Sequence, residues 1–401
     1  MGKKVVWVIN QFAGNSGSGW GERHFYFAKY WKEAGYDVKI ITGSFNHMFN
    51  VLPEVKGLYL SEVYDGIDFI WVKTPKYHPQ SIKRFLSMLV FARNILKLPV
   101  KKFGKPSIII VSSMPIFPIW SGIRLKRKFG AKLIFEIRDI WPLSLQLLGG
   151  YSKNHPAVRF IGWFEKMGYR KSDVIVSLLP NAKEHFENIA EQKIDFKYIP
   201  NGIDENQLKD EELPADFALQ IPGNKFIIGY AGTLGLANAL EYFVDAAGLL
   251  KDDPRFFFVI VGDGYLKNEL EAKSQSWGNV LFLPKIRKNQ VQRMLKHFDA
   301  CFIGWSDTPL YKHGVSANKY SDYMLAGKPI IASNNLIKEP VELSGCGIIV
   351  KPASADAIKY GIIQLYNMPI VEREKMGEKG KSYVKKFHSI KNLADSYAEL
   401  F

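Results

Sequence analysis

Short apolar runs rich in β-branched residues recur along the chain, and longer segments of helical period separate them. In the first half of the chain these runs lie at residues 5–10, 38–42, 68–72, 107–113, 131–137 and 173–179. Between the first two runs, residues 22–35 carry apolar side chains at helical spacing and end at a glycine. Strands and helices that alternate in this way predict an α/β domain built on a doubly wound parallel sheet.

The same pattern restarts after residues 197–208, where Pro200 and Asn201-Gly202 indicate a turn. The apolar runs of the second half lie at residues 226–232, 256–262, 280–284, 300–304, 329–333 and 347–350. We therefore expect two Rossmann-like domains that face each other across a cleft, and a last helix over about Met376 to Phe401. The expected boundaries are 1–197 and 198–380 for the domains, and 381–401 for a C-terminal helix that packs back toward the first domain.

The charge of the chain points to an anionic partner. Its 401 residues contain 54 Lys and Arg against 39 Asp and Glu, a formal net charge of +15. Nucleic acid, a membrane surface and a phosphorylated small molecule all fit such a charge, and composition does not choose among them. Nucleic acid is the least favoured, because the positive charge is spread among the predicted helices without a recognised nucleic-acid module.

Cysteine usage and hydropathy favour a cytoplasmic protein. Cys301 and Cys346 lie in apolar contexts with no CxxC or nearby His spacing, so neither a disulfide framework nor a zinc site is expected. The N-terminal residues do not resemble a secretory signal. The longest apolar run, residues 108–120, is too short to span a bilayer.

Candidate chemistry is expected in the loops beyond the carboxyl ends of the strands, where open α/β sheets bind their ligands. The loop after the first strand carries Gly14, Gly17, Gly19 and Gly21 just before a helix, which allows its backbone to approach an anion. It does not match G-x-G-x-x-G, and no acidic residue follows the second strand, so a nicotinamide cofactor is disfavoured. A glycine-rich turn without a ligand is the alternative.

Charged residues gather where the fifth strand ends, in EIRDIWP (136–142). Glu136, Arg138 and Asp139 are candidate site residues, because charged side chains in such loops often serve binding or catalysis. The alternative is a structural ion pair of Arg138 with Asp139 or Glu136.

Two strand-to-helix turns of the second half are candidate phosphate loops. One contains Gly232, Thr233 and Gly235, and the other contains Gly262 and Gly264. Backbone N–H groups and the Thr233 hydroxyl are suitable donors to phosphate. Plain turns explain either loop equally well when it is taken alone.

The stretch SANKYSDYMLAGKP (316–329) reads as a helix with Ser316 as N-cap and Lys319 at the third helical position. A cation there opposes the helix dipole at a cost of a few tenths to about 1 kcal/mol, but an anion bound between the helix N-terminus and the ammonium reverses that sign. Asp322 is expected on the same face, where it can accept hydrogen bonds from sugar hydroxyls. The alternative is an i,i+3 surface pair of Lys319 with Asp322.

Six motifs in this order resemble the GT-B glycosyltransferases of family 4, particularly the branch that builds bacterial surface polysaccharides such as O-antigen and capsule and is similar to L-fucosamine transferases. They are the glycine loop with its following helix, RDIWP, IPNGID, GTLG, VGDG and SANKYSDYMLAGKP. The resemblance implies a nucleotide-sugar donor, possibly UDP-linked, in the second domain and a lipid-linked glycan acceptor against the first. It also implies retention of anomeric configuration, with no catalytic metal and no cofactor, since the nucleotide sugar is a substrate.

Residue by residue, the resemblance places Asp322 where the family has the second glutamate of its E-x7-E motif, and Gly314 where it has the first. Thr233 and Asn238 stand where the family grips the diphosphate with Arg and Lys, and Arg138 stands in place of a histidine before Asp139. Lys319, Lys285 and Arg287 are then the expected sources of positive charge. The implied catalytic residues are Glu136, Arg138, Asp139 and Lys319; the implied donor-binding residues are Gly19, Gly232, Thr233, Gly235, Gly262, Gly264, Lys285, Arg287, Ser316, Lys319 and Asp322.

The acceptor is expected at the inner face of the plasma membrane, with the protein bound there peripherally. Residues 76–105 interleave basic and apolar side chains, as in an amphipathic helix that lies on an anionic membrane surface. A solvated helix face over the core is the alternative. Two other functions remain open: a GT-B-like UDP-sugar epimerase, and a catalytically silent nucleotide-sugar-binding protein, which Gly314 suggests.

Overall fold

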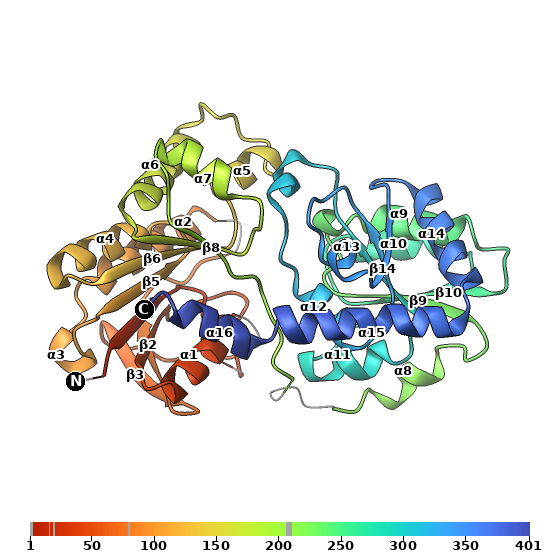
Figure 1. Ribbon diagram of the computed structural model, residues 1–401, viewed down its shortest axis with the longest axis horizontal. Coiled ribbons are helices and arrows are strands. Elements are labelled where there is room, and N and C mark those ends of the chain that lie inside the picture. The colour runs from red at the N-terminus through yellow and green to blue at the C-terminus, as the bar shows by residue number, and fades with distance from the viewer. Residues whose placement is uncertain (1–2, 16, 19–20, 79–80, 206–210) are drawn as a thin grey trace. The chain divides into compact units, whose positions relative to one another are not determined.

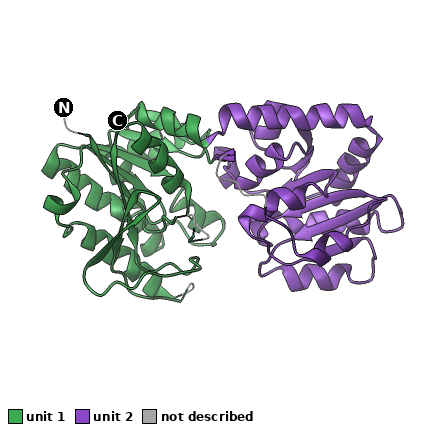
Figure 2. Ribbon diagram, turned by 90° about the horizontal axis from the view of Figure 1, so that it is seen from below, with its two compact units in different colours: residues 1–201, 390–401 green, residues 202–389 purple. Residues whose placement is uncertain are grey.

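The computed structural model describes residues 3–15, 17–18, 21–78, 81–205 and 211–401. The chain divides into two compact units (Figure 2). Unit 1 comprises Met1–Asn201 and Ile390–Phe401, and unit 2 comprises Gly202–Ser389. Each unit is a three-layer arrangement of helices on both faces of a central sheet (Figure 1).

Unit 1 is built on an eight-stranded sheet with the order β3-β4-β2-β1-β5-β6-β7-β8. All neighbours are parallel except the edge strand β3, which runs antiparallel to β4. Because β1 lies between β2 and β5, the chain reverses its direction of winding there, and ligands bind at such switch points. The strands are β1 (Val5–Ile9), β2 (Asp37–Gly43), β3 (Tyr59–Tyr64), β4 (Ile67–Val72), β5 (Ile108–Ser112), β6 (Lys132–Ile137), β7 (Val174–Ser177) and β8 (Phe196–Tyr198).

Helices cover both faces of this sheet and bury two apolar clusters against it. Phe27, Trp31 and Tyr397 contribute to the cluster under α1 and α16, whereas Phe91 and Phe186 belong to the cluster on the opposite face. The helices of unit 1 are α1 (Arg23–Glu33), α2 (Ile82–Ile95), α3 (Val100–Phe103), α4 (Pro118–Phe129), α5 (Leu143–Leu147), α6 (Pro156–Lys171), α7 (Lys183–Ala190) and α16 (Ile390–Ala398).

Unit 2 contains a fully parallel six-stranded sheet with the order β11-β10-β9-β12-β13-β14. Its switch point lies between β9 and β12. The strands are β9 (Phe226–Ala231), β10 (Phe256–Val261), β11 (Val280–Leu283), β12 (Ala300–Gly304), β13 (Ile330–Ser333) and β14 (Gly347–Val350). The helices are α8 (Ala215–Leu219), η2 (Leu236–Asn238), α9 (Leu240–Gly248), α10 (Lys267–Ser274), α11 (Lys288–Leu295), η3 (Pro309–His313), α12 (Asn318–Leu325), α13 (Pro340–Ser344), α14 (Ala355–Asn367) and α15 (Ile370–Phe387).

Every strand predicted from the apolar runs is present, and the prediction of two doubly wound α/β halves is confirmed. The prediction missed β3 and β8. The edge strand β3 alternates partly buried with exposed positions, and β8 has only three residues, so neither forms a continuous apolar run. The units end at Asn201 and Ser389, whereas the expected domain boundaries were 197 and 380.

The prediction of one last helix over Met376 to Phe401 is wrong, because the helix is interrupted after Phe387. The backbone O of His388 accepts a hydrogen bond from Ile203 N at 2.8 Å, and Ser389 forms a parallel bridge with Ile203. These contacts satisfy the backbone outside a helix, so α15 ends in unit 2 and α16 begins in unit 1.

Helix α16 lies beside α1 (Figure 1), and aromatic side chains pack the two helices together. The Tyr397 ring centroid lies 5.2 Å from that of Trp31 and 5.8 Å from that of Phe27. The Trp31 indole donates to the backbone O of Ala394 at 2.9 Å. Within the residues described above, no helix is long and apolar enough to cross a membrane.

Replacing Tyr397 with Ala tests whether α16 is part of the core of unit 1. The ring is fully buried, so its removal leaves a cavity and costs about 3–5 kcal/mol. We expect a lower urea midpoint and faster hydrogen exchange in peptides of α1. Tyr360→Ala is the matched control, since Tyr360 is 69% exposed on α14; equal midpoints for the two variants would contradict this packing.

Candidate functional site

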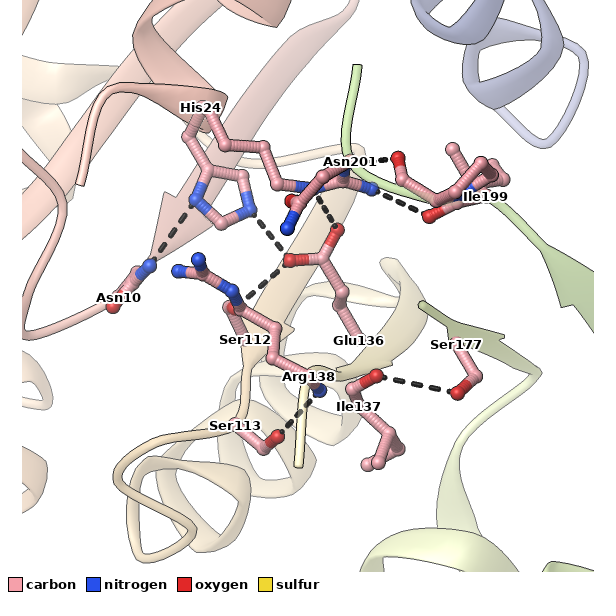
Figure 3. Close-up of polar contacts among 12 residues, drawn as sticks. Asn10, His24, Ser112, Ser113, Glu136, Ile137, Arg138, Ser177, Ile199 and Asn201 are labelled. Atoms are coloured by element: carbon pink, nitrogen blue, oxygen red, sulfur yellow. Dashed lines mark hydrogen bonds and ion pairs between the residues drawn. The ribbon is translucent and has the colours of Figure 1, made fainter. Parts of the chain in front are cut away.

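Glu136 is the centre of a buried polar network at the carboxyl ends of β1, β5 and β6 (Figure 3). Its side chain is fully buried. Ser112 Oγ donates to Oε1 at 2.9 Å, and His24 Nε2 lies 2.9 Å from the same oxygen. Arg23 Nε donates to Oε2 at 3.2 Å. Both carboxylate oxygens are therefore occupied by other side chains of unit 1.

Arg23 and His24 lie in the first turn of α1, where positive charge opposes the helix dipole. Arg23 also donates from Nη2 to Ile199 O at 2.8 Å and from Nη1 to Pro200 O, so it connects α1 to the segment after β8. The Asn10 amide nitrogen lies 3.1 Å from His24 Nδ1. With Asn10 as the donor there, the imidazole proton lies on Nε2 and points at Glu136.

The electrostatics of this network favour an ionised Glu136 and a neutral His24. Burial alone would raise the pKa of Glu136, but the charges of Arg23 and Arg138 and the hydrogen bond from His24 outweigh it and hold that pKa well below its ordinary value. Burial lowers the pKa of His24 despite the neighbouring carboxylate. Glu136 thus acts as a fixed counter-charge, and the geometry does not support proton exchange between Glu136 and a substrate.

Arg138 and Asp139 do not pair with each other. Asp139 accepts a hydrogen bond from Ser144 Oγ at 2.6 Å, in the opening turn of α5, and burial raises the pKa of Asp139. The Arg138 backbone N–H donates to Ser113 Oγ at 2.9 Å. Its guanidinium lies beside Glu136, yet no acceptor in the described part of the chain is within hydrogen-bond distance of it (Figure 3). The structural ion pair considered for Arg138 is therefore not formed.

Backbone conformation and packing require one of the glycines in the loop after β1. Gly21 has a φ of +79°, and a Cβ there would lie 2.1 Å from Phe12 O. Gly14 N donates to Gly21 O at 3.1 Å, which closes the loop on itself. Gly19, which we predicted to bind the donor, lies outside the described residues.

In unit 2, the prediction that Ser316 is the N-cap is wrong by one residue. Ala317 has the extended backbone of an N-cap residue, with φ −86° and ψ 137°, and the helix begins at Asn318. Lys319 is therefore the second helical residue. It remains in the first turn, so the conflict between its charge and the helix dipole persists.

Lys319 is a partly buried cation held by neutral groups. Its Nζ donates to Tyr230 OH at 3.1 Å and to Asn238 Oδ1, and it lies 4.8 Å from the centroid of the Tyr230 ring and 5.7 Å from that of Trp305. Burial lowers the pKa of Lys319 from its ordinary value of 10.5 to about 7. A cation in this setting is stabilised by an anion that binds next to it.

The same two neutral side chains connect Lys319 to the first candidate phosphate loop. Tyr230 OH donates to Thr233 O at 2.7 Å, and Asn238 Nδ2 donates to the same oxygen at 3.0 Å. A Cβ at Gly232 would lie 3.1 Å from Lys319 Cδ. The structure thus brings Lys319, Gly232 and Thr233 together, and adds Tyr230 and Trp305, which the sequence analysis did not identify.

Asp322 does not pair with Lys319, so the predicted alternative of an i,i+3 surface pair is wrong. Asp322 Oδ1 instead accepts from Lys288 Nζ, at the start of α11. Two other predicted donor-binding cations lie elsewhere on this side of the sheet. Arg287 is exposed and pairs with Glu211 at 3.2 Å, and Lys285 is exposed in the loop after β11.

Packing between loops explains two of the predicted donor-binding glycines. A Cβ at Gly262 (φ +152°) would lie 1.9 Å from Gly232 O, and a Cβ at Gly264 (φ +158°) would lie 2.2 Å from Leu234 O. The N–H groups of Gly232 and Leu234 donate across to Val261 O and Asp263 O, both at 2.9 Å. These two N–H groups are therefore not available to phosphate, contrary to our expectation for the backbone around Thr233.

In the described part of the chain, His, Cys, Asp and Glu side chains form no cluster of three or more that could hold a metal ion. The chemistry visible in the two candidate sites is that of two cations without an ionic hydrogen-bond partner, Arg138 in unit 1 and Lys319 in unit 2. Such groups recognise oxyanions.

Comparison with known proteins agrees with this chemistry. Residues 21–207 match the model of Glycosyltransferase Family 4, and residues 212–383 match that of Glycosyl transferases group 1. A relative from Escherichia coli (strain K12), the putative colanic acid biosynthesis glycosyl transferase WcaI, is 26% identical over 360 residues, which cover 84% of this chain and 85% of that protein. The two family models follow each other along the chain, which therefore belongs to the glycosyltransferases that combine these two domains.

Solved structures show the same fold. Sucrose-phosphate synthase from Thermosynechococcus elongatus aligns with a TM-score of 0.75 at 16% identity, over 99% of this chain and 98% of that one. Anabaena Alr3699/HepE in complex with UDP aligns with a TM-score of 0.66 at 14% identity, over the same shares of the two chains. The fold is the GT-B fold of glycosyltransferases, as the motifs predicted.

Replacing Glu136 with Gln tests its role as counter-charge. The change leaves Arg23 buried without an anion, which costs about 3–5 kcal/mol, so we expect a clearly lower urea midpoint. Glu187→Gln is the matched control, because Glu187 pairs with the exposed Lys193 at the surface. A Glu136→Gln variant as stable as this control would show that Glu136 does not hold the network together.

Proposed function

We propose that this protein is a retaining glycosyltransferase that moves a sugar from a nucleotide-diphosphate donor to a lipid-linked glycan in the synthesis of a bacterial surface polysaccharide. The observation that carries the proposal is Lys319, a partly buried cation beside a strand-to-helix loop with only neutral hydrogen-bond partners. Two similar proteins support this proposal. The E. coli protein is named for colanic acid biosynthesis, and the structure of HepE was solved in complex with UDP.

The proposed role of Lys319 follows from where charge develops in the reaction. Cleavage of the sugar–phosphate bond leaves negative charge on the diphosphate, and a fixed donor aimed there lowers the barrier. Because the pKa of Lys319 is lowered to about 7, an arriving diphosphate also holds the proton on the ammonium. Tyr230 and Asn238 fix the position of Lys319 Nζ, and both side chains donate hydrogen bonds to the backbone O of Thr233.

In this proposal Lys319 supplies the positive charge that a metal ion provides in other transferases, so the reaction needs no metal. Attack from the face of the leaving group gives retention, and the departing phosphate oxygen takes the proton of the acceptor hydroxyl. No separate general base is then required, which fits a Glu136 whose oxygens are already occupied. Asp322 remains a proposed ribose contact that shares its carboxylate with Lys288.

Unit 1 is the proposed acceptor-binding unit, and its surface supports peripheral binding to the anionic inner face of the plasma membrane. Helix α2 exposes Ile82, at 87%, beside the exposed Lys83, and α6 exposes Trp163, at 57%. The rings of Phe85 and Phe160 lie 6.2 Å apart, so α2 and α6 are neighbours. Exposed apolar and aromatic side chains next to lysines are typical of proteins that lie on membranes.

Calorimetric titration with UDP, GDP and their sugars tests the donor site. We expect binding of one nucleotide class by the full chain, and a loss of at least about tenfold in affinity for Lys319→Met, because a charge-assisted hydrogen bond is removed. Between pH 7.5 and 9 the wild-type affinity should fall by about tenfold per pH unit, since the free ammonium loses its proton above its pKa of about 7.

Two variants serve as controls for the donor titration. Lys319→Arg keeps its charge over this range and should show no such pH dependence. Lys375→Met changes an exposed lysine on α15 and should bind like wild type. A pH-independent wild-type affinity, or full binding by Lys319→Met, would remove Lys319 from the donor site. Tight UDP binding without transfer or hydrolysis would favour a silent binding protein.

Sedimentation with lipid vesicles tests the membrane surface. Wild type should bind vesicles that contain anionic phosphatidylglycerol and not neutral phosphatidylcholine vesicles, and the double variant Ile82→Ser, Trp163→Ser should bind on the order of tenfold more weakly. Leu219→Ser is the control, because Leu219 is equally exposed but lies on α8 of unit 2. Equal binding by both variants would place the membrane contact elsewhere or rule it out.

A further inference from the structure

The end of β6 carries one positive charge in excess of its counter-charges. Arg23 and Arg138 are cations, Glu136 is the anion between them, and His24 is neutral because burial lowers its pKa. Asp139 does not compensate Arg138, since its carboxylate accepts from Ser144 at 2.6 Å on the side of α5. The network therefore holds a net charge of about +1 in a largely buried place.

Arg138 is the cation of this network whose guanidinium has no hydrogen-bonded counter-ion among the described residues. Glu136 accepts from Arg23 at 3.2 Å and from Ser112 at 2.9 Å, with His24 Nε2 at 2.9 Å, so its oxygens are already shared among three groups. The Arg138 guanidinium is partly exposed and lies on the side of Asn10 and His24 (Figure 3). A guanidinium has five N–H donors, and none of those of Arg138 is bound by another described residue.

The backbone that carries Arg138 is fixed from both neighbouring strands. Arg138 N donates to Ser113 Oγ at 2.9 Å, after β5. On the other side, Leu178 N donates to Ile137 O at 3.1 Å, and Ser177 Oγ donates to the same oxygen at 3.3 Å. A side chain on such a fixed backbone is preorganised, so its ordering on ligand binding costs little conformational entropy.

A purely structural role does not account for a cation in this position. Burial lowers the pKa of Arg138, the neighbouring Arg23 lowers it further, and only Glu136 opposes them. An apolar or neutral side chain would avoid this cost. An oxyanion that binds the guanidinium reverses the balance, and a planar fork of donors suits a carboxylate or a phosphate oxygen pair.

We propose that Arg138 binds an oxyanion carried by a sugar substrate, such as the carboxylate of a uronic acid or a phosphate ester on the ring. The inference rests on the proposed function, in which a sugar reaches unit 1, and it narrows the substrate class to acidic sugars. Arg138 then selects the substrate, whereas Glu136, Arg23 and His24 are positioning residues that hold its surroundings.

Ligand-detected NMR on the full chain tests this specificity. The probes are a methyl hexuronoside, the matched neutral methyl hexoside, a hexose 6-phosphate and inorganic phosphate. We expect the wild type to bind at least one acidic sugar about tenfold more tightly than the neutral one, with a preference that shrinks between 50 and 500 mM salt. Binding of the uronoside or of the sugar phosphate identifies the source of the oxyanion.

Two variants locate the preference at Arg138. Arg138→Met should abolish the preference for acidic sugars, Arg138→Lys should retain part of it, and Arg127→Met, an exposed arginine on α4, should change nothing. Equal binding of acidic and neutral sugars by wild type, an unchanged preference in Arg138→Met, or inorganic phosphate that binds as well as the sugars would overturn the proposal.

A parallel UDP titration separates this inference from the proposed function. The wild type is titrated with UDP under the same conditions as the sugar probes. If the wild type binds UDP but shows no preference for acidic sugars, the result counts against the role of Arg138 and not against the proposed donor site. A wild type that prefers acidic sugars but binds no nucleotide counts against the proposed donor site alone.

Discussion

The proposed donor site depends on one constraint: a partly buried lysine that has only neutral hydrogen-bond partners. Lys319 follows the start of α12, where the helix dipole is already unfavourable for a cation, and its Nζ contacts only Tyr230 and Asn238. Both effects destabilise the protonated lysine in the free protein. In the proposed function, a diphosphate bound between the helix N-terminus and the ammonium stabilises the protonated lysine. This stabilisation then contributes to donor affinity and to catalysis.

In unit 1, by contrast, a buried cation has an anionic partner within the protein. There Glu136 compensates Arg23 directly, and together with His24 and Ser112 it connects α1, β5, β6 and the segment after β8. Among the described members of this network, Arg138 is the cation whose guanidinium has no hydrogen-bond partner, and we propose it as the ligand contact. Each unit thus has, among its described residues, a cation without an ionic hydrogen-bond partner near the carboxyl ends of its strands: Arg138 in unit 1 and Lys319 in unit 2.

The sequence was sufficient for the fold because buried parallel strands form continuous apolar runs. The strands that escaped detection, β3 and β8, lie at sheet edges and lack such runs. The dipole argument found Lys319 even though the helix begins one residue later than expected. The same argument applies to Arg23 in the first turn of α1, and the sequence analysis missed it because it treated that segment only as a helix after a glycine loop.

Long-range contacts of the site could not be predicted from periodicity. Tyr230 lies 89 positions from Lys319, and Arg23 lies 113 positions from Glu136. Gly262 and Gly264 stay predicted donor-binding residues, but their close approach to the backbone of Gly232 and Leu234 already accounts for a glycine at each position. Close approach to a ligand and close approach to another loop place the same demand on a glycine, so only coordinates distinguish them.

The most direct test of the central claim is an NMR titration of the Lys319 side chain in protein labelled at the lysine ε-carbons, with Lys319→Arg to assign the signal. The account predicts a pKa near 7 in the free protein and a clear rise when the cognate nucleotide diphosphate is bound. A pKa near the ordinary value of 10.5 in the free protein, or no change on binding, would contradict it.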